Sequence, residues 1–240
     1  MTATLHIVGT GPGDPELLTL KAVRTLATAP VIAYFAKRGR QGHARRIAGA
    51  YIPPHAEQLR FEYPYTTEIS VDDARYEPAL ATFYQQSADA IAARLENDQD
   101  VALLCEGDPF FYGSAMYLFD RLAARFPTTI IPGITAMSGC WSQAHRPITH
   151  GDDVLSVLPG TLDEPTLTAR LRNTDAAIIM KVGSNLPKIR SAIEAAGLTH
   201  RATLVERGTM PDSRLIPMSE AGQAAPYFSL VLIPGRQKKR

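Results

Sequence analysis

A glycine- and proline-rich turn near the N-terminus constrains the fold of this chain more than any other segment. Residues 5–8 are apolar and typical of a strand, residues 9–15 read Gly-Thr-Gly-Pro-Gly-Asp-Pro, and residues 16–28 have helical spacing. A strand, a glycine-rich turn and a helix in succession predict an α/β protein that binds a small molecule at the end of its sheet. Asp14 followed by Pro15 predicts the start of that helix.

This turn differs from the glycine fingerprint of dinucleotide-binding proteins. Counted from Gly9, that fingerprint requires a third glycine at the position of Asp14. Pro12 has no N–H to donate to a pyrophosphate, and the carboxylate of Asp14 is unfavourable for a phosphate. The turn therefore predicts stiff, neutral backbone packed against a ligand other than a dinucleotide.

Composition limits the classes of function. The 240 residues are 45% hydrophobic, which is enough for the cores of one or two α/β domains. The net charge of +1 does not favour nucleic acid or an anionic membrane, and no apolar run approaches the ~20 residues of a membrane span. No signal peptide is recognisable, so we expect a cytoplasmic protein. Two cysteines and six histidines without paired spacing predict buried thiols and no bound metal.

Apolar runs and helical stretches alternate along the chain, and the segment 147–153 interrupts the pattern. We therefore predict an N-terminal α/β domain over 1–150 and a C-terminal α/β domain over 151–240. The predicted strands are 5–8, 31–35, 101–105, 128–131, 154–158, 176–182, 202–206 and 228–233. The predicted helices are 16–28, 43–50, 74–97, 114–125, 135–144, 163–172 and 185–196.

Two more glycine-rich turns, residues 105–113 and 132–139, also connect a predicted strand to a predicted helix. In the first, Glu106 and Asp108 are placed to hold hydroxyl or amino groups, and Phe111 to cover an apolar ligand face. In an open α/β sheet such turns line one crevice, so three of them predict a binding site. The alternative is that these residues only cap the helices that follow.

Several motifs occur in an order that resembles the tetrapyrrole methylases, which use S-adenosylmethionine. The matching segments are Val8–Ala22, Gly107–Pro109, Pro132–Ala136, Met180–Gly183, Val205–Thr209 and Pro226–Ser229. Residues 63–68, 106–114, 133–142, 151–161 and 225–232 are similar to members of the family that act in corrin (cobalamin) synthesis. The resemblance covers nearly the whole chain. It implies two α/β domains with the cofactor in the cleft between them, precorrin-2 as the substrate methylated at C20, and a homodimer.

The family's cofactor contacts can be transferred to this sequence position by position. The resemblance implies that S-adenosylmethionine contacts Pro12, Glu106, Gly107, Asp108, Phe111, Thr135, Ala136, Val182 and Gly208. The family binds this cofactor largely through backbone groups, which agrees with turns that have no phosphate cradle.

The catalytic residues are not predicted. Transfer of a methyl group from a sulfonium depends mainly on alignment, and orientation alone supplies roughly 7–11 kcal/mol of a barrier. Relatives that methylate uroporphyrinogen carry an Asp after the second strand, where this chain has Phe35. Water, a substrate carboxylate, Tyr112 and Glu68 are the alternatives for the acceptor of the C20 proton.

The segment Lys37–Arg46 is basic in a chain that is otherwise nearly neutral. Guanidinium groups suit planar carboxylates, so we expect Lys37, Arg38 and Arg40 to meet the acid side chains of the tetrapyrrole. Tyr65 and Tyr112 are further candidates for contact with the substrate. The alternative is a solvated loop. Nucleic acid is a poor partner, because no basic stripe continues through the remainder.

Three other functions compete with this interpretation. A methylase of the same fold can act on cobalt-factor II, the cobalt-loaded analogue in the anaerobic route. A nucleotide-dependent oxidoreductase is disfavoured by Pro12 and by the missing third glycine. A non-catalytic tetrapyrrole carrier or cofactor sensor would bind the same ligands without turnover.

Overall fold

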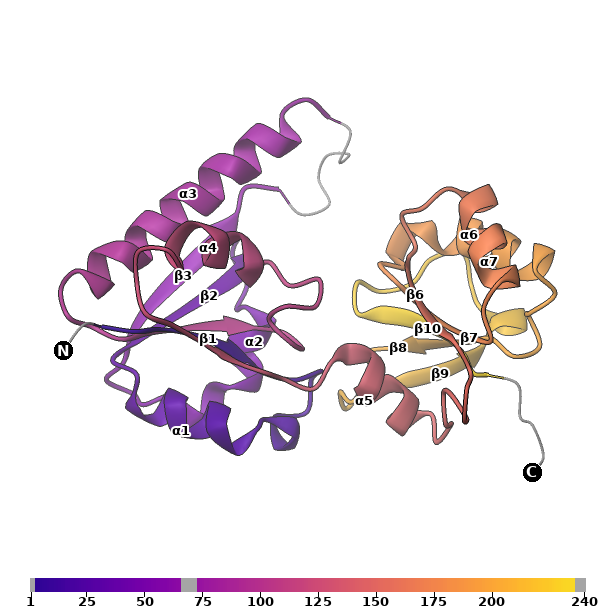
Figure 1. Cartoon of the computed structure of the whole chain (residues 1–240), viewed down its shortest axis with the longest axis horizontal. Helices are drawn as coiled ribbons and strands as arrows, with labels where there is room; N and C mark the ends of the chain where they lie inside the picture. Colours follow the sequence, from indigo (N-terminus) through magenta and orange to yellow (C-terminus); the bar gives the residue numbers. More distant parts are fainter. Residues whose placement is uncertain (1–2, 66–72, 236–240) are drawn as a thin grey trace. The chain divides into compact units, whose positions relative to one another are not determined.

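Two five-stranded sheets organise the chain, one in each of the units Met1–Thr135 and Ala136–Arg240 (Figure 1). The structure is a computed structural model that describes residues 3–65 and 73–235. No helix among these residues is both long enough and apolar enough to span a bilayer.

Over residues 3–65 and 73–135, the first unit has five strands and four α-helices in alternation, with two short 3₁₀ turns. The strands are β1 (Leu5–Gly9), β2 (Val31–Lys37), β3 (Glu57–Tyr63), β4 (Val101–Cys105) and β5 (Thr128–Ile131). The helices are α1 (Leu20–Thr28), α2 (His43–Ile47), α3 (Tyr76–Leu95) and α4 (Ala115–Leu122), and the 3₁₀ turns are η1 (Pro15–Leu17) and η2 (Gly49–Tyr51).

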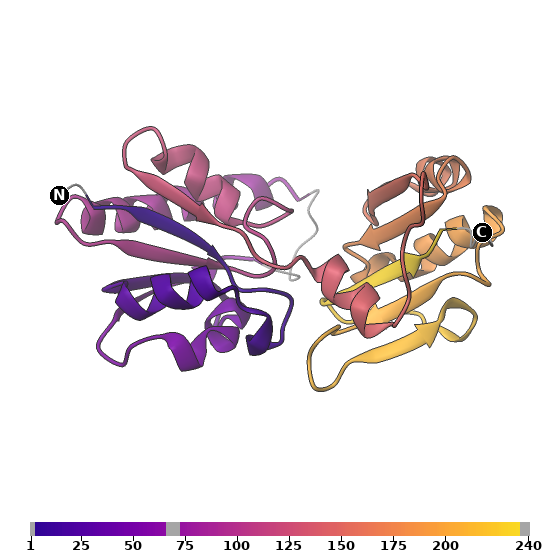
Figure 2. The ribbon, with the colours of Figure 1, turned by 60° about the horizontal axis from the view of Figure 1, so that its bottom comes forward.

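The first sheet is entirely parallel and has the order β3-β2-β4-β1-β5. Helices α3 and α4 cover one of its faces, and α1 and α2 cover the other (Figure 2). Because every strand runs in the same direction, the turns that follow β1, β4 and β5 lie at the same edge of the sheet.

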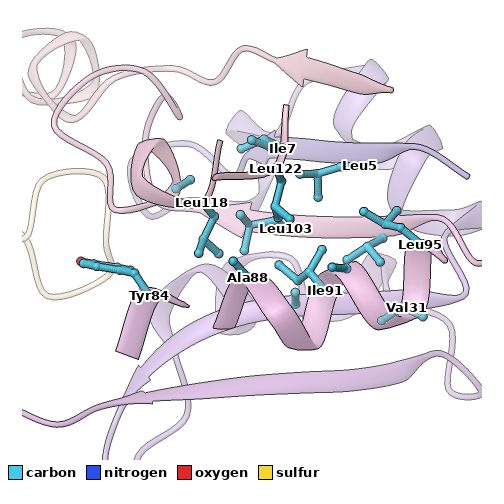
Figure 3. Close-up of a cluster of buried hydrophobic side chains, with 14 of the residues drawn as sticks. Leu5, Ile7, Val31, Tyr84, Ala88, Ile91, Leu95, Leu103, Leu118 and Leu122 are labelled. Atoms are coloured by element: carbon cyan, nitrogen blue, oxygen red, sulfur yellow. The ribbon is translucent and has the colours of Figure 1, made fainter. Parts of the chain in front are cut away.

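Strand residues alternate between the two cores of this unit. Leu5, Ile7 and Leu103 face α3 and α4, whereas Val8 and Leu104 face α1 and α2. Figure 3 shows the first of these cores, with Leu103 of β4 among side chains from α3 and α4. The helical spacing expected over 74–97 is confirmed, with buried side chains at Phe83, Tyr84, Ser87, Ala88, Ile91, Ala92 and Leu95.

The helix expected over 16–28 is divided into two parts. Asp14 accepts the N–H of Glu16 at 2.9 Å and begins η1, as the Asp-Pro signal predicts. Thr19 then accepts the N–H of Ala22 at 3.1 Å and begins α1. The segment therefore has two N-terminal capping residues, Asp14 for η1 and Thr19 for α1.

The second unit has a mixed sheet in the order β6-β7-β10-β8-β9. Only β6 and β7 pair in parallel, whereas the β7–β10, β10–β8 and β8–β9 pairs are antiparallel. The strands are β6 (Leu155–Pro159), β7 (Ala176–Met180), β8 (Thr203–Glu206), β9 (Arg214–Pro217) and β10 (Ser229–Ile233). The helical elements are α5 (Ala136–Gln143), α6 (Glu164–Arg172), η3 (Gly183–Asn185), α7 (Leu186–Ala195) and η4 (Met218–Glu220).

Helix α5 packs within the second unit, although the expected boundary near 150 would place it in the first. Cys140 and Trp141 of α5 contact the face of the second sheet that presents Ile178, Val205 and Leu230. Helices α6 and α7 cover the opposite face of that sheet. The division between the units accordingly falls between Thr135 and Ala136.

Two strands, β3 and β9, were not expected from the sequence. Both lie at an edge of their sheet. The even-numbered residues of β3 and most of β9 are exposed, so neither segment shows the continuous apolar run of the central strands. Every strand and helix that was expected among the described residues is present, with shifts at the ends, and β3 and β9 are additional.

Candidate functional site

Three glycine-rich turns meet at the edge of the first sheet where β1, β4 and β5 end. Gly11 and Gly107 form an antiparallel bridge, in which Gly107 donates its N–H to the Gly11 carbonyl at 2.9 Å. The N–H of Thr10 binds the Cys105 carbonyl at 2.8 Å, and its hydroxyl donates to the same oxygen at 3.1 Å. The first turn is thus joined to the second through backbone groups.

The third turn packs against the first two so closely that a side chain does not fit. A Cβ atom on Gly133 would lie 2.1 Å from the Gly107 carbonyl oxygen, and one on Gly9 would lie 2.6 Å from the Gly133 nitrogen. Real Cβ atoms do not approach so closely, so these positions require glycine. The prediction that the three strand ends share one region of the unit is confirmed.

Asp108 ties the second turn to the third. Its Oδ1 accepts the N–H of Phe110 at 3.0 Å, and its Oδ2 accepts the N–H of Gly133 at 3.1 Å. Both carboxylate oxygens therefore accept backbone hydrogen bonds and hold the two turns together. This structural role was not predicted from the sequence. Contact of Asp108 with the cofactor stays a prediction.

Glu106 connects the second turn to α2. Its Oε1 accepts the N–H of Ala44, near the start of that helix, at 3.1 Å. Part of the Glu106 residue is accessible to solvent, but the protein around its carboxyl group desolvates that group and raises its pKa. Backbone hydrogen bonds from Glu106 itself and from Ala44 oppose that rise in the pKa.

The remaining part of the second turn presents aromatic rings. Phe111 is half-buried, and its ring meets the edge of Tyr112 at a centroid distance of 5.0 Å. Tyr112 is 46% exposed and has a φ of 57°, a left-handed conformation that is uncommon for a bulky residue. The turn therefore holds Tyr112 in a strained backbone conformation with its side chain facing solvent.

Phe35 lies in β2, two residues before the end of the strand, and packs against other aromatic rings. Its ring lies 5.4 Å from Tyr63, 5.9 Å from Phe83 and 6.1 Å from Tyr84. Phe83 and Tyr84 are themselves buried in the core of the first unit. Position 35 therefore carries no base, and its side chain belongs to a cluster of aromatic rings.

Lys37 is the last residue of β2, and Arg38 and Arg40 lie in the turn that follows it. Residues 37–40, the basic turn, are at the same edge of the sheet as the glycine-rich turns. Lys37, Arg38 and Arg40 are exposed, and neither Arg38 nor Arg40 has an ion-pair partner among the described residues. Gly42, after this turn, needs to be glycine because a Cβ would lie 2.2 Å from the Phe35 carbonyl oxygen. Tyr65 is half-buried and follows the end of β3, whereas Glu68 lies outside the described residues.

Sequence reasoning missed the polar residues of β3 that hold this basic turn. Arg60 donates through Nη2 to the Arg40 carbonyl at 2.8 Å and pairs with Glu62 at 2.7 Å. The signal that would have found them is the alternation of apolar and polar residues over 57–63.

The other predicted contacts are found as follows. Pro12 is half-buried in the first turn, and Thr135 and Ala136 lie within the third turn, as the last residue of the first unit and the first residue of the second. In the second unit, Val182 is fully buried, and its carbonyl accepts the N–H of Asn185 at 2.7 Å. Gly208 is packed so that a Cβ would lie 2.3 Å from Cys140 Sγ. Their contact with a cofactor stays a prediction.

The chemistry of the turns fits S-adenosylmethionine better than it fits a nucleotide. The three turns are rich in glycine and proline, carry the three acids Asp14, Glu106 and Asp108, and contain no Lys or Arg. Such a set has no cation for a phosphate, whereas acids and backbone carbonyls suit a cofactor that carries a sulfonium and an ammonium.

Residues 4–222 match the family model of the Tetrapyrrole (Corrin/Porphyrin) Methylases. A Precorrin-2 C(20)-methyltransferase from a Sinorhizobium species is 57% identical over 95% of this chain and 94% of its own length. A Cobalt-precorrin-2 C(20)-methyltransferase from Salmonella typhimurium is 26% identical over 97% of both chains.

The fold is also found among solved structures. A uroporphyrin-III C-methyltransferase from Thermus thermophilus, solved in complex with S-adenosylhomocysteine, has a TM-score of 0.66 to this chain. The alignment covers 96% of each chain at 23% sequence identity. This likeness establishes the architecture of two α/β units.

Proposed function

Since the chain belongs to the tetrapyrrole (corrin/porphyrin) methylases, we propose that it transfers a methyl group from S-adenosylmethionine to C20 of precorrin-2, giving precorrin-3A in corrin ring synthesis. The observation that carries this proposal is the 57% identity to the Sinorhizobium enzyme along almost the full length of both chains.

The metal-free substrate is favoured over cobalt-factor II. The relative named for the cobalt substrate is 26% identical to this chain, less than half the identity of the relative named for precorrin-2. The packing of the three glycine-rich turns and the absence of any basic residue in them count against a nucleotide-dependent oxidoreductase.

When bound, S-adenosylmethionine would supply an electrophilic methyl group, to which the substrate carbon bonds as the bond from that methyl to sulfur breaks and S-adenosylhomocysteine leaves. The residues of this chain align the two reactants. Asp108 and the Gly11–Gly107 bridge fix the turns, so little backbone motion is needed when ligands bind. Glu106 and Phe111 are proposed to contact the cofactor directly. The further proposed contacts are Pro12, Gly107, Asp108, Thr135, Ala136, Val182 and Gly208.

Phe35 has no group that accepts a proton, so the proton released from C20 leaves by another route. Water, a substrate carboxylate, Tyr112 and Glu68 are the alternatives. Of Tyr112 and Glu68, only Tyr112 is among the described residues. Its side chain is exposed and lies beside Phe111.

Lys37, Arg38 and Arg40 are proposed to bind the carboxylates of the tetrapyrrole, with Tyr65 and Tyr112 as further contacts. This assignment is supported by the position of the basic turn, which is exposed at the same edge of the sheet as the glycine-rich turns. A homodimer and a cytoplasmic location are part of the proposal. The homodimer rests on the family resemblance and is tested by light scattering after gel filtration.

The test of the activity is mass spectrometry of purified protein incubated anaerobically with S-adenosylmethionine and metal-free precorrin-2, with cobalt-factor II in parallel. We expect precorrin-2 to gain one methyl group, with C20 as its position by NMR. A gain on the cobalt substrate alone would assign the chain to the anaerobic route. Cofactor binding without a gain on either substrate would overturn the substrate assignment and leave the fold and the methylase class in place.

A further inference from the structure

The outward face of β3 holds the basic turn and α2 through three polar residues at alternate positions. Gln58 accepts the Nε–H of Arg45 in α2 at 2.9 Å. Two residues further along, Arg60 donates to the Arg40 carbonyl at 2.8 Å. Glu62, two residues further again, accepts the N–H of Gly39 at 3.3 Å.

Arg60 and Glu62 also bind each other, with 2.7 Å between Nη2 of the arginine and Oε1 of the glutamate. One nitrogen of Arg60 thus serves both the Glu62 carboxylate and the Arg40 carbonyl, and the same carboxylate oxygen receives the Gly39 N–H. An exposed ion pair alone stabilises a protein little. This pair also binds two backbone groups of one short turn, the Gly39 N–H through Glu62 and the Arg40 carbonyl through Arg60.

The turn 37–40 has few contacts of its own besides the hydrogen bonds from Arg60 and Glu62. Gly39 has a φ of 71°, and a Cβ at this position would meet nothing within 4 Å, so the space around Gly39 is open. Within the turn, the backbone bond is that of Arg40 N–H to the Lys37 carbonyl at 2.9 Å. Arg38 and Arg40 flank Gly39, so the backbone of Gly39 and Arg40 sets where these two side chains start and the direction in which they leave the turn.

We propose that Arg60 and Glu62 are positioning residues, which fix the turn 37–40 so that Arg38 and Arg40 receive carboxylate groups of the tetrapyrrole. This inference rests on the proposed function and deepens it. It assigns the recognition of the substrate's acid side chains to a pair of residues on an edge strand that do not themselves touch the substrate. Preorganising the turn lowers the ordering cost when the substrate binds.

The experiment measures kcat and KM for precorrin-2 and for S-adenosylmethionine in Glu62→Ala and Arg60→Met. We expect the KM for precorrin-2 to rise about threefold to tenfold, as for the loss of one or two positioned charged contacts. The kcat and the KM for S-adenosylmethionine are expected to change less than about twofold. Arg60→Lys keeps a donor and is expected to recover part of the affinity for precorrin-2.

The same strand offers matched controls. Glu57, at the opposite end of β3, pairs with Arg94 at 2.6 Å, and their side chains are 41% and 32% exposed, against 37% and 36% for Glu62 and Arg60. Glu57→Ala and Arg94→Met remove an equivalent ion pair that does not touch the basic turn. Both controls are expected to leave the KM for precorrin-2 unchanged. An equal rise in the controls would assign the effect to general destabilisation and overturn the inference.

A double-mutant cycle separates this inference from the proposed function. Arg38→Ala combined with Arg40→Ala should raise the KM for precorrin-2, and adding Glu62→Ala to that pair should cause no further rise. If Arg38→Ala with Arg40→Ala leaves the KM unchanged, the turn does not bind substrate. If it raises the KM but Glu62→Ala and Arg60→Met do not, the positioning role is wrong while the turn retains its role. If the unmodified protein does not methylate precorrin-2, the proposed function itself fails.

Discussion

Asp108 accepts the backbone N–H of Gly133 at 3.1 Å and so joins two turns that lie 25 residues apart in the sequence. We expect Asp108→Ala to lower the free energy of unfolding by about 1.5–3 kcal/mol, because the N–H groups of Gly133 and Phe110 both lose a charged acceptor. Urea denaturation measures this loss, and calorimetry with S-adenosylhomocysteine should show weaker binding.

The matched control for that substitution is Asp89→Ala, which removes an exposed carboxylate that accepts only the Gln85 side chain in α3. It should stay within about 0.5 kcal/mol of the unmodified protein. Equal losses for Asp89→Ala and Asp108→Ala would contradict a special role for the bond to Gly133.

Gly133 has no room for a methyl group. We expect Gly133→Ala to reduce the free energy of unfolding by about 1–3 kcal/mol, because the new Cβ would lie 2.1 Å from the Gly107 carbonyl oxygen and the turns would have to separate. Gly222→Ala is the control, since nothing lies within 4 Å of its Cβ position. Urea unfolding of both variants tests the prediction, which fails if the two are equally stable.

Glu106 gives a pH dependence of stability with a defined sign. Desolvation raises the pKa of its carboxyl in the folded protein, so ionisation is less favourable in the folded state than in the unfolded state. This penalty is absent below the ordinary pKa of glutamate, grows as the pH rises through that value, and is complete above the raised pKa.

Glu106→Gln removes the charge and keeps an oxygen that accepts the N–H of Ala44. We therefore expect the variant to be more stable than the unmodified protein at neutral pH, with the difference disappearing in acid. Urea unfolding over a series of pH values measures it. A difference that is constant with pH would show that the carboxyl titrates alike in both states.

Phe35 contributes to stability through its aromatic neighbours. We expect Phe35→Ala to cost about 3–5 kcal/mol, because the ring is buried against Tyr63, Phe83 and Tyr84. Leu20→Ala, which truncates a side chain on a residue that is 73% exposed, should cost about 0.5 kcal/mol or less. Comparable losses in thermal unfolding would indicate that the aromatic cluster collapses around the gap.

The two thiols should be inert in the folded protein. Burial raises the pKa of both Cys105 and Cys140 to about 12, so almost no thiolate is present near neutral pH. A thiol reagent such as Ellman's reagent should label neither cysteine under native conditions and both in urea. Rapid labelling of one cysteine in the native protein would reveal a local opening around it.

The glycine-rich turns could be predicted because their signals are local. A strand, a Gly-rich segment and a capping residue stand next to one another in the sequence, and a parallel sheet brings such ends to one edge. The contacts that lock the turns could not be predicted in this way. The bond from Ala44 to Glu106 spans 62 residues, and no pattern in the sequence pairs them.

Edge strands were missed for a different reason. Strand β3 alternates Leu59, Phe61 and Tyr63 with polar residues, and only the apolar half is packed against the core. Burial on one face gives a weaker hydrophobic signal than the continuous runs of β2 and β4. The residues that hold the basic turn lie on the overlooked face of this strand.

The place of β10 in the second sheet has a consequence for the nascent chain. The strands of the first sheet are all complete once Ile131 has been synthesised, whereas β10 lies between β7 and β8 and is made last. Until residues 229–233 leave the ribosome, β7 and β8 each present an edge without its native neighbour. A chain truncated before Ser229 would therefore have a complete first sheet, while the β6–β7 and β8–β9 pairs of the second sheet would each expose an unpaired strand edge. Such edges are prone to aggregation and are recognised by chaperones and proteases.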